Sequence, residues 1–117
     1  MALVLTDASF QKEIAEFKGV ALVDFWATWC GPCRIQGPIV DSIATKLANN
    51  KDVKVGKLDV DENGQTAMAF HIMSIPTIVI FKDGQAQETI VGLRSEQDLM
   101  DKLNYYINSW LYRHYLL

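Results

Sequence analysis

The sequence lacks the features that mark membrane, nucleic-acid-binding and secreted proteins. Its longest apolar runs, such as residues 78–81, are far shorter than the roughly 20 residues of a transmembrane helix, so we expect no membrane contact. The net charge is only −3 and Lys and Arg form no cluster, which argues against nucleic acid as a partner. No basic segment with a cleavage site opens the chain, so we expect no signal peptide and, by default, a cytoplasmic location.

Cysteine is scarce, because the 117 residues include only Cys30 and Cys33. A disulfide between them would close too small a loop to stabilise the fold appreciably. A structural zinc site needs about four ligands, and only His71 and His114 could join the thiols, at a spacing that matches no zinc pattern. We therefore expect no metal and interpret the pair as a redox centre.

The rest of the composition predicts a single α/β domain. Half of the residues are hydrophobic and 21% are charged, as in a globular protein with a sizeable core. The strand and helix patterns follow the order βαβαβαββα, which predicts a mixed five-stranded sheet flanked by four helices. The expected strands are residues 2–5, 20–26, 53–58, 78–81 and 87–91, and the expected helices are 7–17, 32–49, a short one ending near 70, and one after residue 95.

Local signals refine this outline. Asp83-Gly84 lies between two apolar runs, which predicts a tight hairpin turn. Ser95 is well placed to cap the last helix at its N-terminus. Apolar residues at helical spacing predict which face of the second helix is buried: Ile35, Ile39, Ile43 and Leu47.

The two cysteines stand in the segment Cys30-Gly31-Pro32-Cys33, after a buried strand and at the start of a helix. Free backbone N–H groups and the helix dipole favour a thiolate at that position, which is occupied by Cys30. Cys33 follows one turn later, within reach of Cys30 but pointing further inward. One cysteine can then attack a disulfide while the other resolves the mixed intermediate.

Three segments resemble the thioredoxin family: Val23-Asp24-Phe25-Trp26-Ala27, Trp29-Cys30-Gly31-Pro32-Cys33 and Ser74-Ile75-Pro76-Thr77. The similarity in element order and spacing runs from about residue 5 to residue 107. It implies the thioredoxin fold and a general protein disulfide reductase that works through the Cys30/Cys33 dithiol. It also implies electrons from NADPH through a thioredoxin reductase, no cofactor bound by this chain, and disulfide-containing client proteins.

Asp24 and Pro76 each have a structural and a functional interpretation. Asp24 lies in an apolar strand, where a carboxylate is unfavourable. It is either a buried acid paired with Lys57 or, as the resemblance implies, a proton acceptor of raised pKa that works with Lys57 to deprotonate Cys33. Pro76 either begins a strand or, again by resemblance, follows a cis peptide bond that faces the cysteines and leaves the Ile75 backbone free to bind an extended client.

The resemblance also implies a flat apolar surface on which clients dock. Its residues are Trp29, Gly31, Pro32, Val60, Ile75, Gly92 and Leu93. One departure lies nearby, since Gln36-Gly37 replaces the small apolar pair that is common in this family. Gly37 weakens its helix by up to about 1 kcal/mol relative to alanine, and we expect no change of activity.

Two rival functions remain. Disulfide oxidases and isomerases of the same fold typically have histidine in place of Pro32, so Gly31-Pro32 favours a reductase. A binding module without catalysis would use only the client surface or the C-terminal tail. Full biological activity of a Cys30→Ser variant would favour that second rival.

The C-terminus departs furthest from the family. We assign residues 1–107 to the thioredoxin domain and residues 108–117 to an aromatic extension that continues the last helix. Apolar residues along this helix keep near-helical spacing: Leu99, Leu103, Tyr106, Trp110 and Leu117. The extension either folds back onto a monomeric domain or exposes an aromatic patch that drives self-association or recruits a partner.

Overall fold

The computed structural model describes residues 1–116 and confirms the predicted α/β architecture. The strands are β1 (Leu3–Leu5), β2 (Val20–Trp26), β3 (Val53–Asp59), β4 (Thr77–Lys82) and β5 (Gln85–Val91). The α-helices are α1 (Asp7–Phe10), α2 (Gly31–Lys46), α3 (Gly64–Ala69) and α4 (Glu96–Leu111). Two π-helical segments, Gln11–Ala15 and Tyr112–Leu116, continue α1 and α4.

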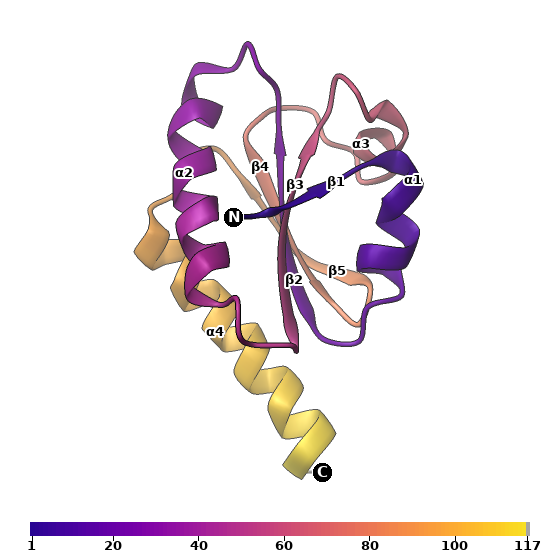
Figure 1. The fold of residues 1–117 in the computed structure, drawn as a ribbon, viewed down its shortest axis with the longest axis vertical. Helices are drawn as coiled ribbons and strands as arrows, with labels where there is room; N and C mark the ends of the chain where they lie inside the picture. Colours follow the sequence, from indigo (N-terminus) through magenta and orange to yellow (C-terminus); the bar gives the residue numbers. More distant parts are fainter. Residues whose placement is uncertain (117) are drawn as a thin grey trace.

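The five strands form one mixed sheet in the order β1-β3-β2-β4-β5. Strands β1, β3 and β2 are parallel, whereas β4 is antiparallel to both β2 and β5. Helices α2 and α4 cover one face of the sheet, and α1 and α3 cover the other (Figure 1). Strand β2 is therefore enclosed on both edges and both faces, and its residues 20–25 are all buried.

The side chains of β2 divide between two hydrophobic cores. Val20 and Leu22 belong to the core beneath α2 and α4. Val23 and Phe25 belong to the core on the opposite face, where the ring of Phe25 approaches another phenylalanine ring at 6.4 Å. Because side chains alternate along a strand, Asp24 faces the same side as Val20 and Leu22, beneath α2.

The buried face of α2 differs from the one predicted. Ile35 is 55% exposed, and Ile39 and Leu47 are only partly buried, so of the predicted row Ile43 alone is fully enclosed. The inward face instead carries Cys33, Gln36, Val40, Ile43 and Ala44. The physical reason is that Cys33 must turn inward to reach Cys30, and this sets the rotation of the whole helix about its axis. Residues three, seven and ten positions after Cys33 then face the sheet with it.

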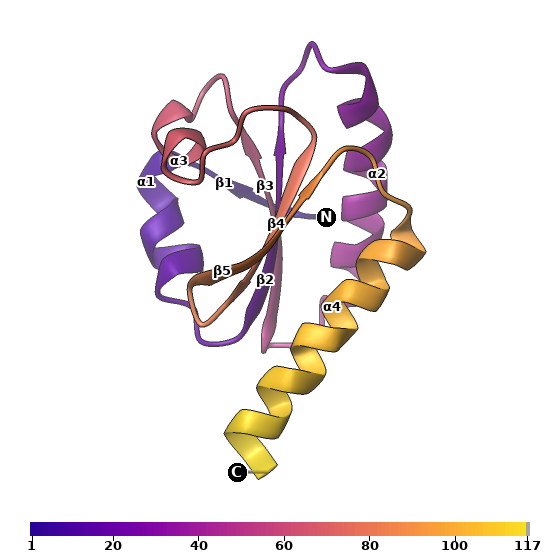
Figure 2. The same cartoon turned by 180° about the vertical axis from the view of Figure 1, so that it is seen from behind.

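The last helix begins at the N-cap Ser95, as predicted, and extends well beyond the sheet (Figure 2). Trp110 is buried and its indole N–H donates to Asp83 Oδ1 at 2.8 Å. The ring of His114 stacks on Trp110, and its Nε2 lies 3.3 Å from Asp83 Oδ2. The extension is thus held against the β4–β5 turn, while three apolar side chains near its end are exposed: Tyr112, Tyr115 and Leu116. Leu117, the last residue of the predicted row, lies outside the described residues.

The predicted hairpin turn is present between β4 and β5. Asp83 and Gly84 have φ values of 50° and 80°, the left-handed backbone that two-residue hairpin turns require. A Cβ atom at Gly84 would also overlap the backbone carbonyl oxygen of Ala15. Glycine is therefore required at position 84 for two independent reasons.

A pair of glycine variants tests this packing. Gly84→Ala should lower the free energy of unfolding by at least about 1–2 kcal/mol, because alanine is strained at positive φ and meets Ala15. Gly37→Ala, at a helical position where a Cβ meets nothing within 4 Å, should raise it by about 0.5–1 kcal/mol. Urea unfolding of both variants measures the two effects. Equal unfolding midpoints for the two variants would contradict the conclusion that position 84 requires glycine.

Candidate active site

The two cysteines lie where the central strand β2 passes into α2. Cys30 is the N-cap of α2, and its Sγ accepts the backbone N–H of Cys33 at 3.2 Å. Pro32 occupies the first helical turn. A backbone N–H at that position would have no acceptor within the helix, so the missing N–H of proline costs no hydrogen bond. Cys30 and Cys33 form a disulfide with their Cα atoms 5.3 Å apart. The structure therefore shows the oxidised form of the pair.

The two sulfur atoms face different surroundings. Cys30 Sγ lies 3.7 Å from the carbonyl oxygen of Ile75, which precedes Pro76 across a cis peptide bond. Cys33 instead lines a pocket on the inner side of α2 that also contains Asp24. One sulfur thus lies beside the exposed loops, and the other lies beside a buried carboxyl group.

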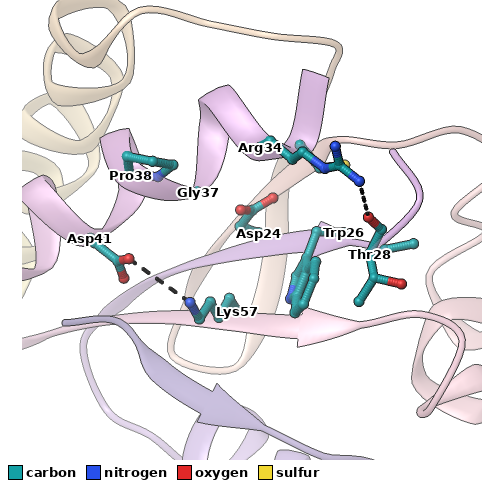
Figure 3. Close-up of a pocket in the computed structure, with 10 residues that line it drawn as sticks. Asp24, Trp26, Thr28, Arg34, Gly37, Pro38, Asp41 and Lys57 are labelled. Atoms are coloured by element: carbon teal, nitrogen blue, oxygen red, sulfur yellow. Dashed lines mark hydrogen bonds and ion pairs between the residues drawn. The ribbon is translucent and has the colours of Figure 1, made fainter. Parts of the chain in front are cut away.

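Asp24 is 1% exposed, and no donor within residues 1–116 bonds either of its carboxylate oxygens. Its side chain points from β2 toward α2 (Figure 3). Burial raises the pKa of Asp24 from 3.8 to about 7, with Lys57 acting in the opposite direction and Asp41 adding to the rise. The group can therefore hold or release a proton near neutral pH, which is the property a general base requires.

Lys57 is the register partner of Asp24 on β3 but is not in ion-pair contact with it. Its Nζ instead lies 3.9 Å from Oδ2 of Asp41 on α2 (Figure 3). Asp41 Oδ1 also accepts the backbone N–H of Ala2 at 2.9 Å. The direct Asp24–Lys57 pair considered from the sequence is therefore wrong. The lysine reaches the partly exposed Asp41, where its ammonium group stays solvated.

A pocket of about 180 Å³ connects these groups beneath the active-site helix. Its volume leaves room for water molecules, and its lining includes the polar groups of Asp24, Asp41 and Lys57. The lining residues are Asp24, Trp26, Ala27, Thr28, Cys33, Arg34, Gly37, Pro38, Asp41 and Lys57. Proton exchange between the buried carboxyl group and solvent has a physical route through this pocket.

A second hollow, of about 350 Å³, lies on the Cys30 side. The predicted docking residues Trp29, Val60 and Ile75 line it together, with Ile72, Met73 and Ser74. Trp29 is 68% exposed, and its indole N–H donates to Asp61 Oδ2 at 2.8 Å, which fixes the ring at the rim. An exposed apolar surface of this kind is suited to binding another protein.

The remaining predicted docking residues do not line this hollow but lie on segments next to Cys30 or bonded to Pro76. Gly31 and Pro32 are exposed beside Cys30. The backbone N–H of Gly92 donates to the carbonyl oxygen of Pro76 at 2.9 Å, which joins the loop after β5 to the cis-proline segment. Leu93 follows on this loop and is partly exposed.

Comparisons with known proteins agree with this geometry. The family model described as thioredoxin matches residues 1–105. The chain belongs to the thioredoxin family. A thioredoxin of Listeria monocytogenes is 45% identical over 107 residues, which cover 92% of this chain and all of that protein.

Two further relatives extend the comparison. A thioredoxin of Mycobacterium bovis is 47% identical over 100 residues, covering 86% of this chain and 84% of that protein. A thioredoxin of Staphylococcus aureus is 45% identical over 105 residues, covering 89% and 97%. With its redox-active pair, the chain is a thiol–disulfide oxidoreductase of the protein-disulfide reductase class.

Residues 1–116 contain neither a membrane-spanning helix nor a metal-binding cluster. No helix among them is both long and apolar enough to cross a lipid bilayer. No group of three or more His, Cys, Asp or Glu side chains in residues 1–116 is arranged to hold a metal ion. His71, one of the two histidines weighed as metal ligands, adopts a left-handed backbone with φ 55° just after α3.

Sequence reasoning missed three residues of this thioredoxin site. Asp41 could have been found, because Cys33, Gly37 and Asp41 follow one another at four-residue spacing on one helical face. Asp61 and Met73 had no such signal. Asp61 reaches Trp29 across the fold, and Met73, which is 92% exposed, joins the hollow only because the preceding loop folds there.

Replacing Asp24 by asparagine tests the raised pKa. Between pH 3.8 and about 7 the unfolded chain binds fewer protons than the folded one, so the wild-type protein should lose stability as pH rises through this range. Asp24→Asn should lack this loss and be more stable at pH 8 by up to about 4 kcal/mol. Urea unfolding of the oxidised proteins from pH 4 to pH 8 measures the difference. A wild-type stability that does not fall across this range would contradict the assignment.

Asp41→Asn tests whether the Lys57–Asp41 pair acts on Asp24. The substitution removes a negative charge and frees the lysine, and both changes favour an ionised Asp24. We expect the pKa of Asp24 to fall by about one unit, the effect of one nearby charge at an effective dielectric constant near 20. Carboxyl ¹³C NMR titration measures it, with Asp101→Asn on α4 as a control of equal charge. Equal shifts in the two variants would refute a specific role for Asp41.

Proposed function

We propose that Cys30 is the attacking cysteine and Cys33 the resolving one. The observation that carries this assignment is the asymmetry of the two sulfurs. Cys30 caps α2 and lies beside the docking hollow, whereas Cys33 lines the pocket of Asp24. In the reduced form, the positive end of the helix and the N–H of Cys33 favour a thiolate on Cys30.

The reaction then proceeds by two exchanges. The Cys30 thiolate attacks one sulfur of a client disulfide, forming a mixed disulfide while the other client sulfur leaves as a thiolate. Cys33 loses its proton and attacks Cys30 Sγ, and the first client sulfur leaves. The client has gained two electrons, and Cys30 and Cys33 have lost them as their disulfide forms.

Asp24 is proposed to accept the proton of Cys33, with Lys57 as its auxiliary. The carboxyl group shares a pocket with Cys33, and its pKa of about 7 suits proton transfer near neutral pH. Lys57 supports the ionised form of Asp24 from the neighbouring strand. Because its ammonium group is held by Asp41, this support acts across the pocket and not through a direct bond.

The client is proposed to bind as an extended segment across the loops around Cys30. The Ile75 backbone before Pro76 would pair with the client, as in the addition of a strand to a sheet edge. Apolar contacts would come from the docking residues named above: Trp29, Gly31, Pro32, Val60, Ile75, Gly92 and Leu93. The exposure of Trp29 next to Cys30, and of Leu93 on the loop bonded to Pro76, supports this placement.

The oxidised pair is proposed to be recharged by a thioredoxin reductase that draws on NADPH, in the cytoplasm. Membership of the thioredoxin family supports this partner and disulfide-containing proteins as clients. On this proposal the chain itself binds no cofactor. The domain proper is taken as residues 1–107, with residues 108–117 as an extension that needs no part in the exchange.

The reduction potential of the Cys30–Cys33 pair tests the direction of electron flow. We expect a value near about −270 mV, the known value for thioredoxin itself, from equilibration with a glutathione buffer. A value near about −180 mV, as known for protein disulfide isomerase, would mean that the pair donates disulfides. Cys33→Ser serves as a control because it cannot close the disulfide.

The same variant tests the order of attack. Cys33→Ser should accumulate a mixed disulfide through Cys30 when mixed with an oxidised protein, whereas Cys30→Ser should accumulate little. Non-reducing electrophoresis followed by mass spectrometry measures both. Trapping chiefly through Cys33 would reverse the assigned roles.

A further inference from the structure

Gln36 is a buried polar residue that the reaction above leaves unexplained. It lies on α2, three residues after Cys33, and its side chain is 0% exposed. A buried amide is tolerated only when its donor and acceptor are both satisfied, so its partners indicate its role.

Both polar atoms of this amide bind the backbone of one residue, Arg94. The N–H of Arg94 donates to Gln36 Oε1 at 2.8 Å, and Gln36 Nε2 donates to the carbonyl oxygen of Arg94 at 3.1 Å. The side chain thus holds the loop after β5 much as a neighbouring strand would. The guanidinium group of Arg94 pairs with Asp98 at 3.4 Å and donates from Nη1 to the carbonyl oxygen of Leu93 at 3.4 Å.

The loop held by Gln36 carries two of the proposed docking residues, Gly92 and Leu93. Its first residue, Gly92, has a φ of 91° and is bonded to the carbonyl oxygen of Pro76 at 2.9 Å. Arg94 lies two residues later and is bonded to Gln36, so the partly exposed Leu93 stands between two fixed points. One anchor belongs to the cis-proline segment, and the other belongs to the helix that bears Cys33.

We propose that Gln36 is a positioning residue that holds the Gly92–Leu93 loop at a set distance from the cysteine pair for client docking. This inference rests on the proposed docking surface. Releasing the loop would leave the buried amide of Gln36 and the backbone of Arg94 without partners, so the clamp favours the docked position of the loop. An apolar residue at position 36 would fill the same space without this link.

Gln36→Met removes the hydrogen bonds and keeps the length of the side chain. With insulin as a protein disulfide, KM should rise about three- to tenfold with kcat unchanged, a change of the size expected when about one net hydrogen bond is lost. Reduction of the small disulfide DTNB should stay within about twofold, because it makes little use of the loop. Hydrogen exchange at the Arg94 amide should accelerate at least about tenfold, as expected when a buried bond is lost.

A matched control separates this role from a general loss of stability. Thr66→Val removes a buried hydrogen bond to Asp7 on the opposite face of the sheet, where the hydroxyl group donates to Asp7 Oδ1 at 2.6 Å. It should lower the free energy of unfolding without raising KM for insulin. Equal increases of KM in Thr66→Val and Gln36→Met would overturn the proposal.

The remaining outcomes are also decisive. If Gln36→Met does not fold, hydrogen exchange of the Arg94 amide in the wild-type protein serves as the test instead. Protection of this amide as strong as that of the buried part of α2 would support the proposal. Exchange as fast as that of exposed loop amides would overturn it. Failure of the wild-type protein to reduce insulin would refute the proposed function. An unchanged KM in folded Gln36→Met would refute this inference alone.

Discussion

Enclosure of the central strand β2 is the constraint on which the active site depends. The strand pairs with β3 and β4 and is covered by helices on both faces, so residues 20–25 have no access to solvent. Asp24 is therefore held in a low-dielectric environment without a direct partner, and its pKa rises. The same strand ends at the loop that carries Cys30. Strand β2 therefore determines both the position of the dithiol and the pKa of Asp24.

The disulfide separates two environments, which the proposed mechanism uses in different steps. On the Cys30 side lie exposed loops and the hollow bordered by Trp29, suited to contact with another protein. On the Cys33 side lies the pocket that also contains Asp24 and Lys57. Helix α2 also connects two parts of the site, because it contributes Cys33 and Asp41 to the pocket and Gln36 to the hydrogen bonds that hold the loop after β5. On the proposed mechanism, a small rotation of α2 would therefore alter attack, proton transfer and docking together.

Much of this arrangement could be predicted from local signals in the sequence. The strands, the Asp83-Gly84 turn and the Ser95 cap each depend on residues close together in the chain, and all were placed correctly. The buried face of α2 was not, since apolar spacing favoured Ile35 over Gln36. Hydrophobic periodicity cannot reveal a buried amide whose partners lie 58 residues away.

The sequence by itself determined the dithiol, the order of the elements and the presence of an acid in a buried strand. These features depend only on residue types and on spacings between residues that are close together in the chain. Only the tertiary structure decided that Lys57 binds Asp41, that Trp110 packs against the β4–β5 turn, and that an amide of α2 holds the loop after β5. The physical reason is that a hydrogen bond or ion pair depends on ångström distances between side chains from different elements, and the packing of those elements sets these distances.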